Sequence, residues 1–261
     1  GDQLHPEVGP LAARPDDRVL LIEAESFARK LPYHPHKLTL VFAAMRHFRD
    51  ELRERGRTAD YRQVETFADG FREHFAAHPG DELVVMRPPS HGGADRLRSI
   101  ADSLDGTIEI VENDLFLCSP AAFDEWAGDA DSYRQEEFYR FMRRKTGYLM
   151  AGEDPVGGEW NFDDDNRETP PEGYSPPDPP TFEPDATTRE TRQWVEDTFD
   201  GSYGEEPYGG AWADPEPFRW PVTREQALSV LDHFVDACLP DFGPYQDAMV
   251  GGEWAMAHSL L

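Results

Sequence analysis

The chain has 261 residues, 38% of them hydrophobic, which is enough for one large or two ordinary domains with a packed core. Its 52 acidic residues against 25 basic ones give a formal net charge of −27, which argues against a protein that binds nucleic acid mainly through phosphate contacts. No apolar run approaches the roughly 18 residues of a membrane span and no signal peptide is visible, so we expect a soluble, cytoplasmic monomer.

The basic residues are almost all arginine, since Lys30, Lys37 and Lys145 are the only lysines. The acidic residues are spread over the chain instead of forming a tail. This composition is typical of halophilic proteins, because in molar salt the Debye length falls to about 3 Å and screens self-repulsion. The same screening removes most of the electrostatic affinity for DNA, so a DNA-binding protein of this kind would depend on short-range contacts and stacking.

Residues 1–130 alternate between strand-like and helix-like segments, the pattern of a parallel sheet wrapped by helices. The predicted strands are 18–23, 60–64, 82–86 and 107–112, with a further short strand at 114–118, and the predicted helices are 36–55, 66–77 and 94–104. This order predicts an α/β fold with a doubly wound, Rossmann-like sheet of five parallel strands. We expect much of the first strand to precede Gly1.

Doubly wound sheets bind ligands at the carboxyl ends of their strands. Asp2, Gln3 and Leu4 follow the truncated first strand, and Glu23 ends the second. No GxGxxG sequence follows either strand, so we do not expect a dinucleotide there. From the residues alone two interpretations stay open: these side chains contact a ligand, or Glu23 caps the next segment and Gln3 holds a turn.

The two cysteines show no metal-ligand spacing. A His-x-His pair such as His34 and His36 can ligate a metal, but no third ligand stands nearby, so we predict no metal here. His34 and His36 precede the helix 36–55, and we expect them to cap and pack its start. His47 lies on the polar face of that helix and is interpreted as a surface histidine. Cys118 and Cys238 are far apart in the sequence and are predicted to be buried, reduced thiols.

Residues 134–167 are predicted to form a helix, a glycine turn and an aromatic, acidic loop. At helical spacing one face carries Phe138, Phe141, Met142, Tyr148 and Leu149, and the other carries Arg140, Arg143 and Arg144. A solvated helix surface is the simplest interpretation of the basic face. The loop contains Trp160 and Phe162 in a run too polar for a strand, so we expect specific contacts to hold it. The acidic run 163–165 is interpreted as solvated charge.

Proline then dominates the chain, with seven in PPEGYSPPDPPTFEPD, which predicts an extended connector between two domains. Two more helices are predicted beyond it, at 187–199 and at 223–239. The second begins at the N-cap Thr223 and ends before Pro240. Its predicted buried residues are Ala227, Leu228, Leu231, Phe234, Val235 and Cys238.

Five stretches together resemble one known family. They are the opening GDQL, AAMRHFRDELRERG, FYRFMRRKTGYLM, PVGGEWNFDDDNR and FGPYQDAM. They are similar, at similar spacing, to stretches of the prokaryotic iron-sulfur (6-4) photolyases and bacterial cryptochromes, the deoxyribodipyrimidine photolyase-related branch of the cryptochrome/photolyase family. The resemblance runs across nearly the whole chain, and we expect the chain to be an N-terminal fragment of such a protein.

The resemblance implies three regions: an α/β antenna domain at 1–130, a helix and proline-rich connector at 131–186, and the start of an all-α FAD-binding domain at 187–261. Gln3, with its neighbours Asp2 and Leu4, and Glu23 would then contact a ribolumazine-type antenna chromophore.

The FAD contacts of the family resemble residues near the end of this chain. Tyr245 stands about a dozen residues before His258 and Ser259, and this arrangement, with Leu260, resembles the one that contacts FAD. A Ser hydroxyl at a helix start also suits a pyrophosphate. From the residues alone, an aromatic loop before an ordinary capped helix is the other interpretation.

The family's activity implies light-driven repair of (6-4) pyrimidine dimers in UV-damaged DNA, by electron transfer from excited reduced FAD. A cryptochrome-type photoreceptor with the same fold is the alternative, and a small-molecule binder using only the N-terminal sheet is a third. The family's [4Fe-4S] ligands, catalytic histidine and lesion-binding residues are expected beyond Leu261. We therefore assign no catalytic residue, and expect the chain alone to be inactive and not to retain FAD stoichiometrically.

Overall fold

The computed structural model describes residues 3–31, 33–199, 216–249 and 251. The chain forms two compact units, Gly1–Asn113 with Thr181–Ser229, and Asp114–Pro180 with Val230–Leu261. The predicted domain boundaries at 130 and 186 stay a prediction. No described helix is long and apolar enough to cross a membrane.

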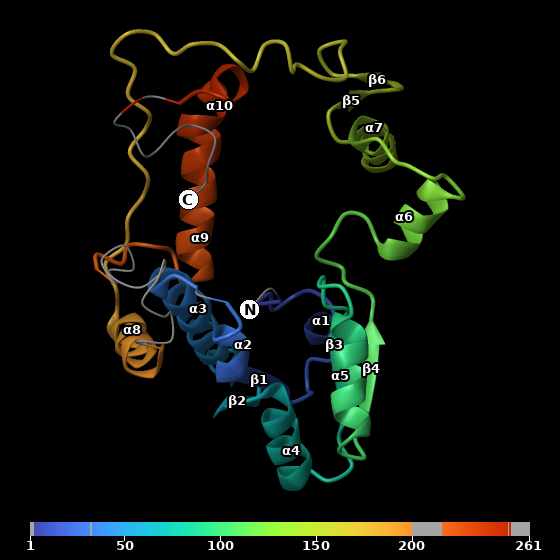
Figure 1. The fold of residues 1–261 in the computed structure, drawn as a ribbon, viewed down its shortest axis with the longest axis vertical. Coiled ribbons are helices and arrows are strands. Elements are labelled where there is room, and N and C mark those ends of the chain that lie inside the picture. Colours follow the sequence, from blue (N-terminus) through green and yellow to red (C-terminus); the bar gives the residue numbers. More distant parts are fainter. Residues whose placement is uncertain (1–2, 32, 200–215, 250, 252–261) are drawn as a thin grey trace. The chain divides into compact units, whose positions relative to one another are not determined.

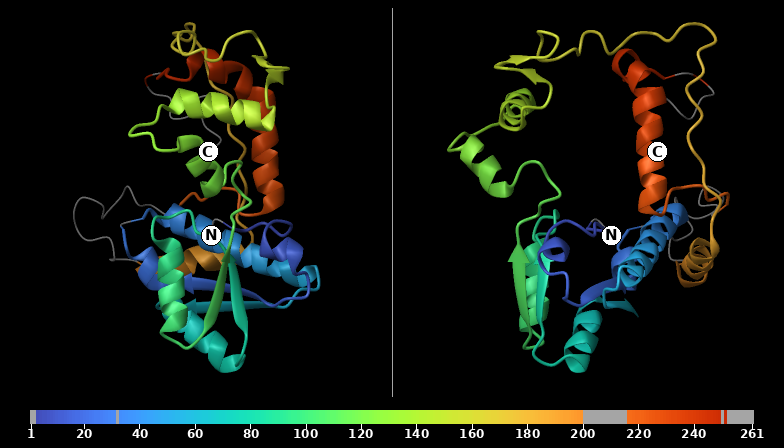
Figure 2. Two further views of the ribbon diagram at one scale, coloured as in Figure 1. Left: turned by 90° about the vertical axis from the view of Figure 1, so that its right-hand side faces the viewer. Right: turned by 180° about the vertical axis from the view of Figure 1, so that it is seen from behind.

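The first unit contains two pairs of parallel strands (Figures 1 and 2). Strand β1 (Val19–Ala24) pairs with β2 (Ala59–Val64), and β3 (Glu82–Met86) pairs with β4 (Thr107–Val111). Each of these strands lies within one residue of its predicted position. Within each pair, a helix connects the two strands, as parallel pairing requires.

The predicted five-stranded doubly wound sheet is not shown among the described residues, which hold these two separate pairs. The further strand predicted at 114–118 is wrong, because these residues form a turn and a bend. The β3–β4 ladder ends at Arg87, whose N–H donates to the carbonyl of Val111 at 2.8 Å. The Asn113 side chain then donates to the carbonyl of Arg87 at 2.9 Å, and the chain turns away from the strand direction.

Helix α3 (Pro35–Glu54) carries most of the core of the first unit. Its buried apolar residues are Leu38, Phe42, Ala43, Met45, Phe48 and Leu52. The side chain of His34 accepts a hydrogen bond from the His36 backbone N–H at 3.1 Å, and His36 accepts one from the Trp220 indole at 3.0 Å. The predicted capping and packing roles of the two histidines are therefore confirmed.

Helix α8 (Ala186–Phe199) lies beside α3, although more than a hundred residues separate them in the sequence (Figure 1). Val195 and Phe199 are each 1% exposed and pack on Phe42 and Met45 of α3. The polar side of α3 is covered as well. His47 was predicted at the surface, but its side chain is 17% exposed and lies 3.3 Å from the Asp185 carboxylate, because the start of α8 lies over it.

The described residues of the first unit form five further helices. They are α1 (Pro10–Ala13), α2 (Glu25–Ala28), α4 (Phe67–Ala77), α5 (Gly93–Asp102) and α9 (Arg224–His233), which continues into the second unit. A capping box starts α4, since Thr66 and Asp69 satisfy each other's backbone N–H groups. Residues 156–185 contain neither helix nor strand, as the prolines predict.

The second unit contains α6 (Pro120–Ala127), α7 (Gln135–Thr146), the two-residue strands β5 (Met150–Ala151) and β6 (Asp154–Pro155), and α10 (Leu239–Tyr245). Aromatic rings join α6 to α7. The ring centroid of Phe138 lies 5.0 Å from that of Trp126 and 5.5 Å from that of Phe123. Helix α7 ends at Gly147, whose φ of 74° is left-handed. Tyr148 and Leu149 were predicted on its apolar face but lie beyond this end and are exposed.

The helix predicted at 223–239 is interrupted. Helix α9 ends at His233, a π-helical turn covers Phe234–Cys238, and α10 follows with Pro240 in its first turn, where a missing N–H costs little. Leu228, Leu231 and Val235 were predicted to be buried but are exposed, while Val230 is buried. The π turn changes the phase of the apolar stripe at Val235, whereas Leu228 and Leu231 precede the turn and lie on an exposed side of α9. Both cysteines are free thiols, with Cys238 buried and Cys118 only half-buried.

Truncation of Phe199 tests the docking of α8 on α3. Phe199→Ala should lower the free energy of unfolding by about 3–5 kcal/mol, because it leaves a cavity in a closed core. The control is Phe27→Ala in the same unit. Phe27 is 50% exposed, so this substitution should lower the free energy of unfolding by less than about 1 kcal/mol. Urea unfolding measures both variants, and equal losses would contradict this packing.

Candidate functional site

The carboxylate of Glu23 lies near the carboxyl end of β1 and is completely buried. Arg46 of α3 binds it with both arms, from Nε to Oε1 at 2.9 Å and from Nη2 to Oε2 at 3.0 Å. The Gln63 amide donates to Oε2 at 2.9 Å, and the Tyr61 hydroxyl donates to Oε1. Both oxygens are therefore satisfied by protein donors, as a buried charge requires.

Burial and charge set the protonation of these partners. Burial lowers the pKa of Arg46, but the hydrogen bonds and charge of Glu23 outweigh it, so the net shift of that pKa is upward. Burial, and then the Glu23 carboxylate, raise the pKa of Tyr61, which keeps its phenol as a donor. Arg46 also donates from Nη1 to the Thr191 hydroxyl of α8 at 3.1 Å. The site is a charged pair that joins α3, α8 and the β1–β2 pair.

Sequence analysis identified Glu23 but not its partners. A usable signal was present in β2, because Tyr61 and Gln63 are two residues apart and so point to one face of the strand. The register pairs Glu23 with Gln63 across the ladder, which places both on that face. Arg46 is the neighbour of His47, which was predicted on the polar face of the helix, and nothing in its local sequence indicated that it would be covered.

Gln3 lies at the carboxyl end of β3, where its side-chain amide donates to the carbonyl of Met86 at 2.9 Å. Leu4 is partly buried and packs against the core clusters of α3 and β1. Gln3 and Glu23 thus each lie near the carboxyl end of a strand, on different strand pairs, and their role in binding a ligand stays a prediction. Asp2 lies outside the described residues.

An open hollow of about 450 Å³ lies at the carboxyl end of β2. Its lining residues are Gln63, Val64, Glu65, Asp69, Arg72 and Glu73. Hydrogen bonds from Thr66 and then Arg72 lower the pKa of Asp69, so this acid is ionised at neutral pH. The acidic lining disfavours a phosphate group. Gln63 both lines the hollow and binds the buried carboxylate of Glu23.

The predicted aromatic loop is held by α7 in the second unit. Trp160 packs beneath three guanidinium groups, with the Cζ atoms of Arg140, Arg143 and Arg144 at 5.2, 5.4 and 4.7 Å from its ring centroid. The expectation of specific contacts is confirmed. Arg143, however, is buried, contrary to the predicted solvated face, because it donates to the carbonyls of Tyr148 and Leu149 beyond the helix end.

Tyr245 is the last residue of α10, and its ring meets that of Tyr174 edge to face at 5.2 Å. The Tyr174 hydroxyl donates to Asp241 at 3.1 Å. Burial and this carboxylate raise the pKa of Tyr174 to about 12, so the phenol is neutral at physiological pH. His258, Ser259 and Leu260 lie outside the described residues.

Comparison with known proteins identifies relatives of this chain. Residues 1–209 match the family model described as deoxyribodipyrimidine photo-lyase-related protein. A (6-4) photolyase of Agrobacterium fabrum is 35% identical over 273 residues, which cover 100% of this chain and 51% of that protein. An uncharacterized protein of Acanthamoeba polyphaga mimivirus is 26% identical over 161 residues, 60% of this chain and 81% of that protein. The chain therefore spans about half the length of the (6-4) photolyase.

Replacement of Arg46 tests the buried pair. Arg46→Met should lower the free energy of unfolding by about 3–5 kcal/mol, because it leaves the Glu23 charge without its main partner. Arg55→Met, at the C-cap of the same helix, is the control, since Arg55 and its partner Glu51 are partly exposed and such pairs contribute about 1 kcal/mol or less. Thermal unfolding measures both. The double variant Glu23→Gln, Arg46→Met should recover part of the loss, and no recovery would contradict the pairing.

Proposed function

Because the chain belongs to the family of deoxyribodipyrimidine photolyase-related proteins, we propose that it functions in light-dependent DNA repair, as part of a flavoprotein that reverses (6-4) pyrimidine photoproducts. The observation that carries this proposal is the 35% identity with a (6-4) photolyase, which extends over the entire chain. The partner is UV-damaged DNA, with the lesion flipped out of the duplex; unpairing is least costly at a damaged base.

FAD is the proposed cofactor, and when bound it supplies the electron transfer that breaks the lesion. Tyr245, with His258, Ser259 and Leu260, is the proposed contact region in this chain. Support for this region comes from the aromatic pair that Tyr245 and Tyr174 form at the end of α10, since aromatic side chains favour contact with a flat ring. The neutral Tyr174 phenol adds a hydrogen-bond donor that Asp241 holds in place.

A ribolumazine-type antenna is the proposed ligand of the first unit, at the carboxyl ends of β1 and β3. Gln3 is already positioned there by its bond to Met86. Glu23 contacts such a ring only if one of its protein donors is replaced. Gln63 is the donor that can leave at least cost, because it is the exposed member of the group and lines the open hollow.

A repair assay tests the proposed activity. UV-damaged DNA incubated with the complete protein at molar salt should lose (6-4) photoproducts under blue light but not in the dark. Antibody detection of (6-4) lesions and of cyclobutane dimers in the same sample measures both activity and lesion choice. Photoreduction of the flavin without loss of either lesion would contradict repair and favour the cryptochrome-type photoreceptor.

Titration of the chain with a ribolumazine, followed by fluorescence quenching, tests the antenna site. Gln3→Leu should weaken binding about fivefold, because one hydrogen bond contributes about 1 kcal/mol. Gln193→Leu, at an exposed position on α8, is the matched control and should bind like the unaltered chain. Equal affinity for all three proteins would exclude Gln3 from the site.

A further inference from the structure

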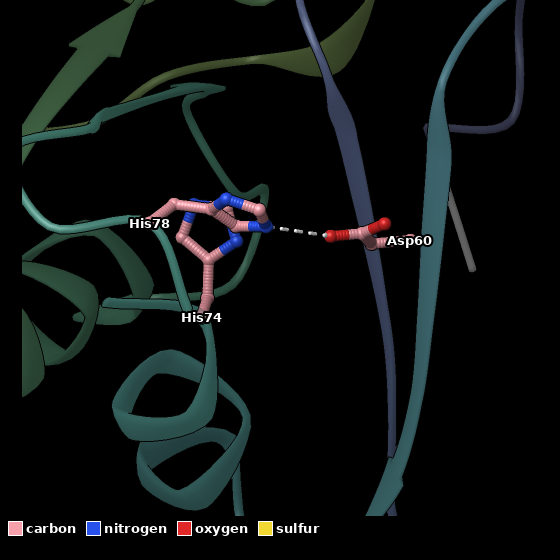
Figure 3. Close-up of side chains that lie close together, drawn as sticks. All are labelled: Asp60, His74 and His78. Atoms are coloured by element: carbon pink, nitrogen blue, oxygen red, sulfur yellow. Dashed lines mark ion pairs between the residues drawn. The ribbon is translucent and has the colours of Figure 1, made fainter. Parts of the chain in front are cut away.

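Three side chains with metal-ligand atoms come together in the first unit: Asp60 of β2, His74 of α4 and His78, which caps the end of α4. One ligand atom from each lies within 4.8 Å of the others. Figure 3 shows the two imidazole rings next to each other, with Asp60 on β2 facing them. The ring centroids are 5.1 Å apart, and His78 Nε2 is 3.3 Å from Asp60 Oδ2.

Local structure explains this arrangement. His74 and His78 are four residues apart, so they lie on one side of α4. Helix α4 packs against β1 and β2 at close range, because a Cβ at Gly70 would lie 2.7 Å from Ile22. One helical turn beyond Gly70, His74 is thereby placed beside Asp60 near the start of β2. The histidine spacing alone did not reveal the group, since its third member lies on a strand.

A fourth residue orients the buried histidine. His74 is 3% exposed, and its Nε2 lies 3.3 Å from the Asp81 carboxylate. Its other nitrogen, Nδ1, is buried and has no hydrogen-bond partner among the described residues. Metal-binding histidines characteristically give one nitrogen to the metal and donate from the other to a carboxylate. An Nε2–H donor to Asp81 leaves the Nδ1 lone pair available, and a buried nitrogen of this kind needs an explanation.

From these contacts we propose that Asp60, His74 and His78 bind a divalent first-row metal ion, with zinc the best fit, and that Asp81 supports His74 from outside the coordination shell. Two imidazoles and one carboxylate are typical zinc ligands, and water completes the fourth position. Atoms bound to tetrahedral zinc lie about 3.4 Å apart, close to the existing separation of His78 and Asp60. Arg18 binds the other oxygen of Asp60, Oδ1, at 3.2 Å. Oδ2 faces His78 at 3.3 Å, with Arg62 Nη2 farther away at 3.9 Å.

The position of the site indicates what the metal does. Asp60 is the second residue of β2, at the amino end of the strand, whereas Gln3 and Glu23 lie at the carboxyl ends. The metal therefore joins α4 to β2 and acts on stability. This metal site is proposed independently of the light-driven activity.

Metal titration of the chain, after treatment with a chelator, tests this site. Zinc should bind with one tight equivalent, raise the melting temperature, and be replaceable by cobalt with a tetrahedral absorption spectrum. His78→Gln and Asp60→Asn should each weaken binding at least tenfold, and Asp81→Asn about 10–100-fold. These positions are more exposed than His74, and circular dichroism checks that each variant is folded. His91→Gln, at an exposed histidine, is the matched control and should bind like the unaltered chain.

Two results would overturn the proposal. One is that zinc binds the unaltered chain no more tightly than it binds the folded His78→Gln variant, which would leave the Asp60–His78 contact as an ordinary ion pair. The other is zinc binding that His91→Gln weakens as much as His78→Gln, which would indicate adventitious binding to surface histidines.

Discussion

The arrangement of the first unit depends on the compensation of one buried negative charge. Glu23 is completely removed from solvent, and an unpaired carboxylate in that position would be too costly to tolerate. Arg46 supplies the compensating charge from α3 and extends to Thr191 of α8. Tyr61 and Gln63 complete the shell from β2. One carboxylate therefore ties together four elements, and their relative positions have to satisfy it.

This constraint affects how the strand edge can bind a ligand. A chromophore at the carboxyl ends of β1 and β3 meets Gln3, which its bond to Met86 already positions, but it meets Glu23 only by displacing a protein donor. In this photolyase-related chain, Glu23 therefore has a structural role whether or not it also contacts the antenna. The second unit uses arginine in a similar way, since Arg143 is buried where it binds the carbonyls beyond α7 and packs on Trp160.

Much of the local structure was predictable because it depends on neighbouring residues. The four parallel strands lie within one residue of prediction, and the start of α4 follows from the Thr66–Asp69 capping box. Local spacing failed where the backbone left the regular helix. Gly147 ended α7 before Tyr148 and Leu149, and the π turn at Phe234–Cys238 left Val235 exposed. The strand positions did not predict how the strands pair, because pairing joins segments that are distant in the sequence. The described residues therefore hold two separate pairs where one five-stranded sheet was predicted.

The sequence by itself determined the family, the positions of the four parallel strands and of helices α3, α4, α5 and α8, and the presence of Glu23 at a strand end, since these follow from local spacing and from sequence similarity. Only the tertiary structure decided which polar groups are buried. Arg46 and His47 look like surface residues within α3, but α8 covers them from far along the chain. Asp60, His74 and His78 likewise come together only when α4 packs on β2. The physical reason is that periodicity shows which side of an element is polar, whereas burial depends on the segment that lies over it.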